Sequence, residues 1–164
     1  MIAIIDYKAG NLTSVKKAFD HLGAETIVTE KPEIVEEADK VVLPGVGHFS
    51  ATRVLDDSGL RESIVNSIER SAPFLGICVG MQWMLASSEE APDVHGLALW
   101  PGECSRFPSG VKSPHVGWND LQIRAGESRH PLTISVGALR STAVLRQVRS
   151  PGQVMSRQHR VHGS

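Results

Sequence analysis

The sequence predicts an α/β fold built on an open, mostly parallel, doubly wound sheet. Two observations predict it. Short apolar runs alternate with amphipathic helical stretches over residues 1–86, and each run is apolar throughout. Strands of this kind, joined by helices, are typical of parallel sheets that are covered on both faces. Beyond residue 87 the pattern changes to short segments rich in Gly and Pro, which favours antiparallel strands and loops.

The first strand is predicted at residues 1–5, which are apolar and end at an acid before a glycine turn. A helix follows, which Asn11 or Thr13 can cap and which Gly23 ends. The second strand, a short acidic helix and the third strand are predicted at residues 25–28, 32–38 and 41–43.

Two helical stretches, residues 50–57 and 60–70, lead to the fourth strand at residues 73–77. This strand turns sharply at Cys78 into a helical pattern that continues through Leu85. The alternation of strands and helices therefore places Cys78 at the carboxyl end of a buried strand.

Composition and charge narrow the classes of function. The chain has 164 residues, of which 41% are hydrophobic and 21% charged, and a formal net charge of −1. These values predict one soluble domain and give no reason to expect a nucleic acid or a membrane as partner. No apolar run approaches the roughly 20 residues that span a bilayer, and no signal peptide is recognisable. The two cysteines, Cys78 and Cys104, favour a cytoplasmic protein with free thiols.

The composition changes near residue 133. Residues 1–132 carry 12 Lys and Arg and 18 Asp and Glu, whereas residues 133–164 carry 5 Arg, no acid and no aromatic residue. We therefore expect a domain at 1–132 and a basic, solvated or disordered tail at 133–164. His159 and His162 have the spacing of a metal pair, but no third ligand is evident, so no metal site is predicted.

The most informative segment is residues 75–82, LGICVGMQ, in which a cysteine stands between two near glycines at a strand-to-helix junction. This is the pattern of a nucleophile elbow, where the tight turn leaves no room for a Cβ. The helix after Cys78 favours the thiolate, and the N–H of Val79 is placed to stabilise an oxyanion. On spacing alone, the alternative that Cys78 is a small buried core residue stays open.

Residues 44–49, PGVGHF, follow the third strand. Their glycines let backbone amides face a ligand at the carboxyl end of a strand, although a plain turn is the alternative. Two such loops on neighbouring strands would form a cleft with a nucleophile on one side and amides on the other. We interpret His48 as a loop residue and Cys104 as a packing residue.

Residues 75–82 resemble the nucleophile motif of the class I glutamine amidotransferases, whose fold is flavodoxin-like. Within this family the resemblance is close to the glutaminase subunits of imidazole glycerol phosphate synthase, and it runs from residue 1 to about residue 132. The further motifs that carry it are residues 5–7 with 10–12 (IDY and GNL), 43–47 (LPGVG) and 114–119 (PHVGWN).

The resemblance implies a role for individual residues. Cys78 would attack the side-chain amide of glutamine, form a thioester and release ammonia. Val79, with Val46 or Gly47, would supply the N–H groups of the oxyanion hole. Gln82 would help to bind the glutamine substrate.

The resemblance also implies a partner. Asn11 and Trp118 would lie near the interface with a cyclase subunit, a (β/α)₈ barrel that uses the ammonia in histidine biosynthesis. It implies no cofactor and no metal.

The sequence departs from the family after residue 132. The family completes its catalytic triad with a His and a Glu two residues apart, but residues 133–164 contain no Glu. We assign neither His159 nor His162 as the base, so no His or Glu of the triad is identified. A shift of reading frame near codon 133 would explain this and would leave the C-terminal part of the sheet incomplete.

Two functions therefore stay open. One is the glutaminase itself, and the other is a catalytically impaired docking module of the same family. A cysteine hydrolase of the same fold is disfavoured by Gln82 and by residues 114–119.

Overall fold

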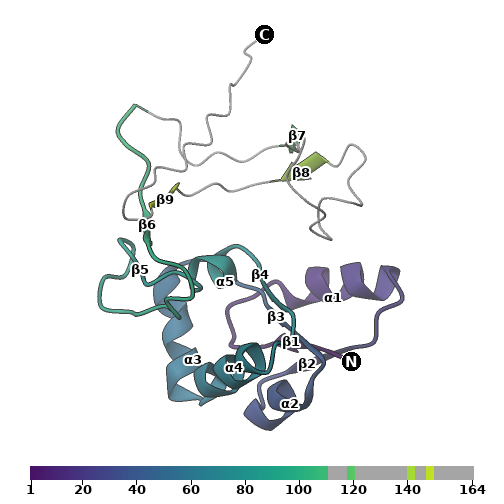
Figure 1. The fold of residues 1–164 in the computed structure, drawn as a ribbon. Coiled ribbons are helices and arrows are strands. Elements are labelled where there is room, and N and C mark those ends of the chain that lie inside the picture. Colours follow the sequence, from purple (N-terminus) through teal and green to yellow (C-terminus); the bar gives the residue numbers. More distant parts are fainter. Residues whose placement is uncertain (111–117, 121–139, 143–146, 150–164) are drawn as a thin grey trace. The chain divides into compact units, whose positions relative to one another are not determined.

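The computed structural model describes residues 1–110, 118–120, 140–142 and 147–149. The chain divides into two compact units. One comprises Met1–Arg106 with Gln147–Ser164, and the other comprises Phe107–Arg146. The first unit contains the main sheet and the helices that cover it (Figure 1).

Four strands form a parallel sheet in the order β2-β1-β3-β4. Ile2 pairs with Thr26 on one side and with Lys40 on the other, and Val41 pairs with Phe74. The open parallel sheet predicted from the sequence is therefore confirmed. The strands are β1 (Ile2–Ile5), β2 (Thr26–Thr29), β3 (Lys40–Leu43) and β4 (Phe74–Gly76).

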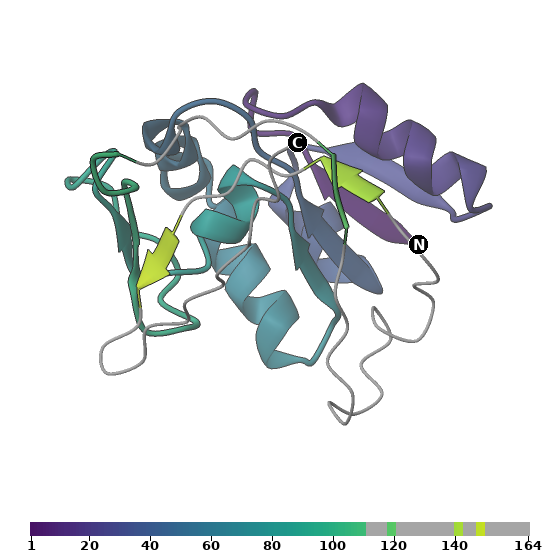
Figure 2. The same cartoon turned by 90° about the horizontal axis from the view of Figure 1, so that it is seen from above.

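Helices cover both faces of this sheet, as the prediction of a doubly wound fold requires. The connecting helices are α1 (Leu12–His21), α2 (Pro32–Glu37) and α4 (Leu60–Glu69). Figure 1 shows α1 on one face of the sheet and α2 and α4 on the other. The view from above shows α1 lying along the side where β2 is the edge strand (Figure 2).

Local signals explain where several helices begin. The side chain of Asn11 caps α1, since its oxygen accepts the N–H of Ser14 at 3.3 Å. Pro32 opens α2 at a position whose N–H would have no partner within the helix. Where the sequence predicts one helical stretch at 50–57, the structure has the 3₁₀ turn η1 (Phe49–Thr52) followed by α3 (Arg53–Asp57).

The helix after Cys78 is shorter than predicted. α5 spans Val79–Gln82, whereas the sequence pattern extends to Leu85. The N–H of Leu97 donates to the Trp83 carbonyl at 2.7 Å, and residues 96, 98 and 99 bond in the same way to carbonyls of residues 84–86. The N–H groups of Met84 and Leu85 donate to carbonyls three residues back, so the chain after Gln82 tightens and the α-helical bonding of α5 stops. The occupied carbonyls of residues 83–86 cannot accept the bonds of a helix that would continue beyond residue 86.

The core lies between the sheet and its helices. The last three residues of β1 and of β3 are buried, and the loops after β3 and β4 add apolar side chains to the same cluster. β4, which the sequence predicts as a buried strand, is only partly covered in the structure, because its middle residue Leu75 is 41% exposed. Among the described residues, the largest fully buried side chains are Trp83, Phe49, Ile4, Ile5, Leu43, Leu55, Leu60 and Ile64.

The remaining strands are short. β5 (Ser87–Ser88) pairs with β6 (Glu103–Ser105) in parallel, and β6 pairs with β9 (Gln147–Arg149) antiparallel. In the second unit β7 (Trp118–Asp120) pairs antiparallel with β8 (Arg140–Thr142). The prediction of antiparallel strands beyond residue 87 is confirmed for the last two pairs and wrong for β5 with β6.

Most of residues 133–164 lie outside the described residues, so the division into a domain and a tail stays a prediction. In the part of the chain that the structure describes, α1 and α4 are the longest helices, with ten residues each. None of these helices has the length and apolar character needed to cross a membrane.

Candidate active site

The carboxyl ends of β1, β3 and β4 meet at one edge of the sheet, and the loops that follow them are in contact. The N–H of Val46 donates to the Ala9 carbonyl at 2.9 Å, which joins the loop after β3 to the loop after β1. Gly45 lies so close to the turn after β4 that a Cβ there would be 2.8 Å from the Cβ of Val79. This edge is where open α/β sheets bind ligands. The structure thus brings together the two loops that the sequence singles out.

Cys78 occupies a strained turn between β4 and α5. Its φ of 55° and ψ of −112° are unusual for a residue with a side chain. A Cβ on Gly80 would lie 2.0 Å from the Leu43 carbonyl oxygen, and one on Gly76 would lie 2.6 Å from the Gly80 oxygen. Both flanking glycines are therefore needed for the close approach of backbones, as a nucleophile elbow requires.

The two cysteines have opposite environments. Cys78 is exposed at the turn, whereas Cys104 lies within β6 and is 1% exposed. Neither cysteine forms a disulfide. The interpretation of Cys78 as a buried core residue is therefore wrong, and the burial of Cys104 agrees with a packing role.

The amides beside Cys78 differ in their availability. Among the described residues, no acceptor takes the N–H of Val79 or the N–H of Gly47, whose φ is 93°. The N–H of Val46, in contrast, already donates to the Ala9 carbonyl. Val79 and Gly47 therefore have N–H groups free to bind a developing negative charge, and Val46 does not.

The short α5 changes one expectation about the thiolate. A helix macrodipole sums over successive aligned peptides, so a four-residue helix supplies only a small part of it. The N–H of Gly80 is also occupied, because it donates to the Ile77 carbonyl at 3.0 Å. The stabilisation of the Cys78 thiolate that was predicted from the helix is therefore reduced to the contribution of the N–H of Val79.

Three buried polar atoms close to the elbow lack partners. The Oε1 of Gln82, the Nε1 of Trp83 and the hydroxyl of Tyr7 have no hydrogen-bond partner among the described residues. Gln82 is only 4% exposed. An unpaired buried polar atom costs about 1–3 kcal/mol, and folded proteins keep few of them. Their concentration here is typical of a site that a polar ligand completes.

Tyr7 is a residue of this site that the sequence analysis noted only as part of a motif. It is 2% exposed and follows β1. Burial, with the neighbouring Cys78 as the second cause, raises the pKa of Tyr7 from 10.0 to about 12. A signal was available in the sequence, since this is the single tyrosine of the chain and it directly follows a buried strand that ends at the site.

Two more side chains join the surrounding loops. The carboxylate of Glu90 accepts the N–H of Phe49 at 2.8 Å, which ties the loop after β3 to the segment after α5. The Nδ1 of His48 accepts the N–H of Ser50 at 3.2 Å and so caps η1. His48 is thus a loop residue, as predicted, whereas no sequence pattern marks Glu90.

The residues expected at a partner interface are less fully described. Asn11 is exposed and serves as the cap of α1. Trp118 begins β7 in the second unit, but its side chain lies outside the described residues, as do His159 and His162. In the described ranges, no group of three His, Cys, Asp or Glu side chains could hold a metal ion.

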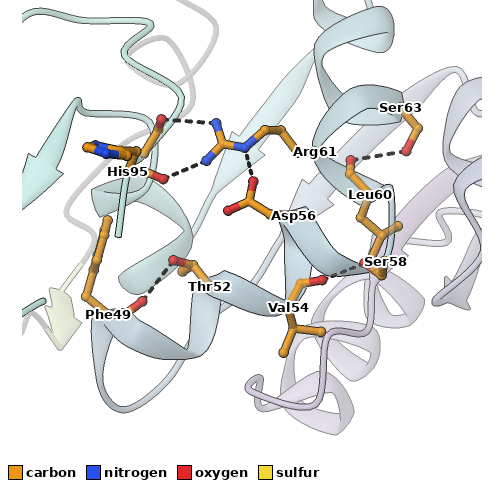
Figure 3. Close-up of polar contacts among 10 residues, drawn as sticks. Phe49, Thr52, Val54, Asp56, Ser58, Leu60, Arg61, Ser63 and His95 are labelled. Atoms are coloured by element: carbon orange, nitrogen blue, oxygen red, sulfur yellow. Dashed lines mark hydrogen bonds and ion pairs between the residues drawn. The ribbon is translucent and has the colours of Figure 1, made fainter. Parts of the chain in front are cut away.

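Arg61 and Asp56 form a charged pair that also reaches the backbone of His95 (Figure 3). The Nε of Arg61 donates to Asp56, while its Nη1 and Nη2 donate to the carbonyls of Gly96 and His95 at 3.0 Å and 2.6 Å. The guanidinium also lies over the Trp83 ring, 4.9 Å from its centroid. Arg61 therefore fixes residues 95–96 against the residue that ends α5.

An open cleft of about 410 Å³ adjoins this pair, but it is not the candidate active site. Its arginines are already paired, Arg53 with Asp93 at 2.6 Å and Arg61 with Asp56. The lining contains no residue of the elbow or of the loop at 44–49.

Known proteins share both the sequence motifs and the fold. Residues 3–161 match the family described as glutamine amidotransferase class-I. A solved structure titled "Crystal structure of glutamine amidotransferase" superposes with a TM-score of 0.72, covering 93% of this chain and 76% of that chain. Since the two are 17% identical, this likeness supports the fold alone.

Several curated relatives carry the name imidazole glycerol phosphate synthase subunit HisH. The relative from Methanothermobacter thermautotrophicus is 54% identical over 75% of this chain and 62% of its own length. The relatives from Geobacter sulfurreducens and Thermus thermophilus are 49% and 48% identical, over 75% and 79% of this chain and 63% and 64% of their own lengths. The chain thus spans less than two thirds of the length of these relatives.

Proposed function

Since the chain belongs to the class-I glutamine amidotransferase family, we propose that it is the glutaminase subunit of imidazole glycerol phosphate synthase. In this role it hydrolyses glutamine to glutamate and ammonia. The observation that carries the proposal is the strained, exposed Cys78 between Gly76 and Gly80 at the carboxyl end of β4. The names of the relatives narrow the family to this member.

The chemistry follows from the elbow and the neighbouring loop. The Sγ of Cys78 attacks the side-chain carbonyl carbon of glutamine, and the carbonyl electron pair moves to oxygen. The N–H groups of Val79 and Gly47 stabilise this oxyanion, and they are better placed than the N–H of Val46, which donates to a carbonyl. The C–N bond then breaks, ammonia leaves with an added proton, and water hydrolyses the thioester to glutamate.

Gln82 is proposed to bind the substrate. Its N–H donates to the Cys78 carbonyl at 3.0 Å, so the two residues lie one helical turn apart on the same face of α5. Its buried Oε1 lacks a partner among the described residues and can accept an N–H of the incoming glutamine.

The proposed partner is a cyclase subunit with a (β/α)₈ barrel, which takes up the ammonia. The relatives' name describes a subunit, and this supports the pairing. We expect Asn11 and Trp118 near the interface. The reaction needs no cofactor, metal, nucleic acid or membrane, and we place it in the cytoplasm.

The proposal does not assign the group that gives a proton to the leaving ammonia. No His or Glu is assigned to it, and residues 133–164 contain no Glu. Acid–base assistance typically contributes roughly 10²–10⁴-fold to a rate. The sequence of that segment therefore favours, as a second candidate, a docking module that binds the cyclase and turns over glutamine slowly.

Ammonia release from glutamine, with a relative's cyclase subunit and its ligand present, tests the proposal. We expect release by this chain to disappear in Cys78→Ala and to persist in Cys104→Ala. Hydrolysis that survives Cys78→Ala would contradict the proposed role of the elbow. Binding to the cyclase without any release of ammonia would support the docking module.

A further inference from the structure

The helix that begins at the elbow is too short to hold its own conformation. α5 is a single turn, Val79–Gln82, and isolated helices of fewer than about 12 residues are marginal in water. Both of its ends must therefore be held by contacts with other segments. At the first end, Gly80 packs against the Leu43 carbonyl. The contacts at the other end lie outside every motif recognised in the sequence.

Trp83 is the residue at which the second end of α5 is held. It directly follows the helix, is 0% exposed, and donates its N–H to the Val79 carbonyl at 2.9 Å. Its own carbonyl accepts the N–H of Leu97 at 2.7 Å. Val79, whose N–H is proposed to bind the oxyanion, is therefore bonded through its carbonyl to a residue that a distant segment holds in place.

Arg61, on α4, contacts both Trp83 and the segment that crosses it. The guanidinium lies over the indole ring, 4.9 Å from its centroid, and donates to the carbonyls of Gly96 and His95 at 3.0 Å and 2.6 Å. Its Nε donates to Asp56, which orients the group (Figure 3). A guanidinium suits this position, because its N–H groups point in fixed directions while its face stacks on an aromatic ring.

We propose that Arg61 is a positioning residue of the active site. It holds Trp83 and residues 95–96 together and so fixes the end of α5. This sets the positions of the Val79 N–H and of Gln82 relative to the nucleophile. A misplacement of about 1 Å can lower a rate about a hundredfold, so a contact outside the site can govern turnover. The inference rests on the proposed function, because it concerns how the nucleophile meets glutamine.

The first test compares two reagents for Cys78 in the chain and in Arg61→Met, which can still cover Trp83 but has no donors. 6-Diazo-5-oxo-L-norleucine is a glutamine-like electrophile that needs the positioned site, whereas iodoacetamide needs only an accessible thiolate. Both adducts are followed by peptide mass spectrometry. We expect the first reagent, at saturating concentration, to react about five- to a hundredfold more slowly in the variant, and iodoacetamide to change less than about twofold. Unchanged reaction with the first reagent, or equal slowing of both, would overturn the proposal.

Arg53→Met is the matched control. Arg53 also contacts the segment that leads to residue 95, but through an exposed ion pair with Asp93. We expect both reagents to react with this variant as they do with the unsubstituted chain. Slowing equal to that of Arg61→Met would mean that the contact with Trp83 has no special part, and would also overturn the proposal.

Arg61→Lys decides the question if circular dichroism shows that Arg61→Met does not fold. Lysine keeps a cation that can lie over the Trp83 ring, but its ammonium lacks the planar fork that reaches both carbonyls at fixed angles. We expect slowing by 6-diazo-5-oxo-L-norleucine alone, smaller than in a folded Arg61→Met. Rates equal to those of the unsubstituted chain with both reagents would refute the proposal.

The unsubstituted chain separates this inference from the proposed function. If it forms no adduct with 6-diazo-5-oxo-L-norleucine at Cys78, the proposed function is refuted, and the role of Arg61 with it. If it forms the adduct and the folded Arg61 variants form it equally fast, only the role of Arg61 is refuted.

Discussion

The guanidinium of Arg61 lies over the indole ring of Trp83, 4.9 Å from its centroid. The same guanidinium donates to two backbone carbonyls in the segment 95–96. Because Trp83 directly follows α5, this contact links α4 to the turn that carries Cys78. Arg61 therefore joins α4 to the residue that follows α5, although it belongs to none of the recognised motifs.

Replacing Arg61 by Met should destabilise the chain by about 2–3 kcal/mol. The methionine can still cover Trp83, but the carbonyls of residues 95 and 96 lose their donors, and a bond to a charged group is worth about 1.5–3 kcal/mol. Urea unfolding followed by tryptophan fluorescence measures the change. Arg53→Met is the control, because its pair with Asp93 is exposed and should contribute little. Equal losses in the two variants would contradict this account.

Replacing Gly80 by Ala should lower the free energy of unfolding by about 3 kcal/mol or more and abolish selective labelling of Cys78. The new Cβ would lie 2.0 Å from the Leu43 carbonyl oxygen, which is part of the backbone and cannot move aside cheaply. Urea unfolding and peptide mass spectrometry report the two effects.

Gly23→Ala is the control that distinguishes the steric clash at Gly80 from the strain of placing a side chain at a positive φ. Gly23 has a φ of 69° but nothing within 4 Å of the added Cβ, so we expect a loss of only about 1–2 kcal/mol. If both alanine variants are equally stable, the close packing of β3 against the elbow is refuted.

The stability of the chain should fall at alkaline pH. The pKa of Tyr7 is raised from 10.0 to about 12 in the folded state. A raised folded pKa contributes stability fully below the unfolded value, and this is lost as pH rises through the folded value. We therefore expect unfolding free energy to decrease between about pH 10 and pH 12, by about 2–3 kcal/mol. The Tyr7→Phe variant should not show this decrease in the free energy of unfolding. An identical alkaline decrease in that variant would mean that a group other than Tyr7 causes it.

Glutamine hydrolysis by the 164-residue chain should be at least about a hundredfold slower than by the Methanothermobacter thermautotrophicus relative, each with cyclase present. The reason is the unassigned base, whose contribution is typically roughly 10²–10⁴-fold. Steady-state ammonia release measures both rates. Comparable rates would mean that a residue of this chain replaces the base, with His48 or His159 as the first to mutate.

The sequence predicts the parallel sheet and the elbow because their signals are local. Apolar runs identify β1, β3 and β4, and the glycines at 76 and 80 mark a turn without room for side chains. The length of α5 could not be predicted in this way. Apolar periodicity through Leu85 indicates a helix, but it does not reveal that Met84 and Leu85 bond three residues back, or that residues 96–99 bond to the carbonyls of residues 83–86.

Tyr7 and Arg61 were missed for a related reason. Tyr7 matters through its contact with Gly45, and Arg61 through its contacts with Trp83 and Gly96. These contacts join segments that are distant in the sequence. The sequence signal for Tyr7 was its position just after a predicted strand, whereas no local pattern marks Arg61. The N–H of Val46 is a similar case, since only the fold shows that it donates a hydrogen bond to the Ala9 carbonyl.

The central claim is that Cys78 is an activated nucleophile with affinity for glutamine, and one measurement tests it most directly. The folded chain is incubated with 6-diazo-5-oxo-L-norleucine, a glutamine-like electrophile, and the adducts are located by peptide mass spectrometry. The account predicts an adduct at Cys78, protection by excess glutamine, and no adduct at the buried Cys104. Equal labelling of both cysteines, or no adduct at Cys78 in folded protein, would contradict it.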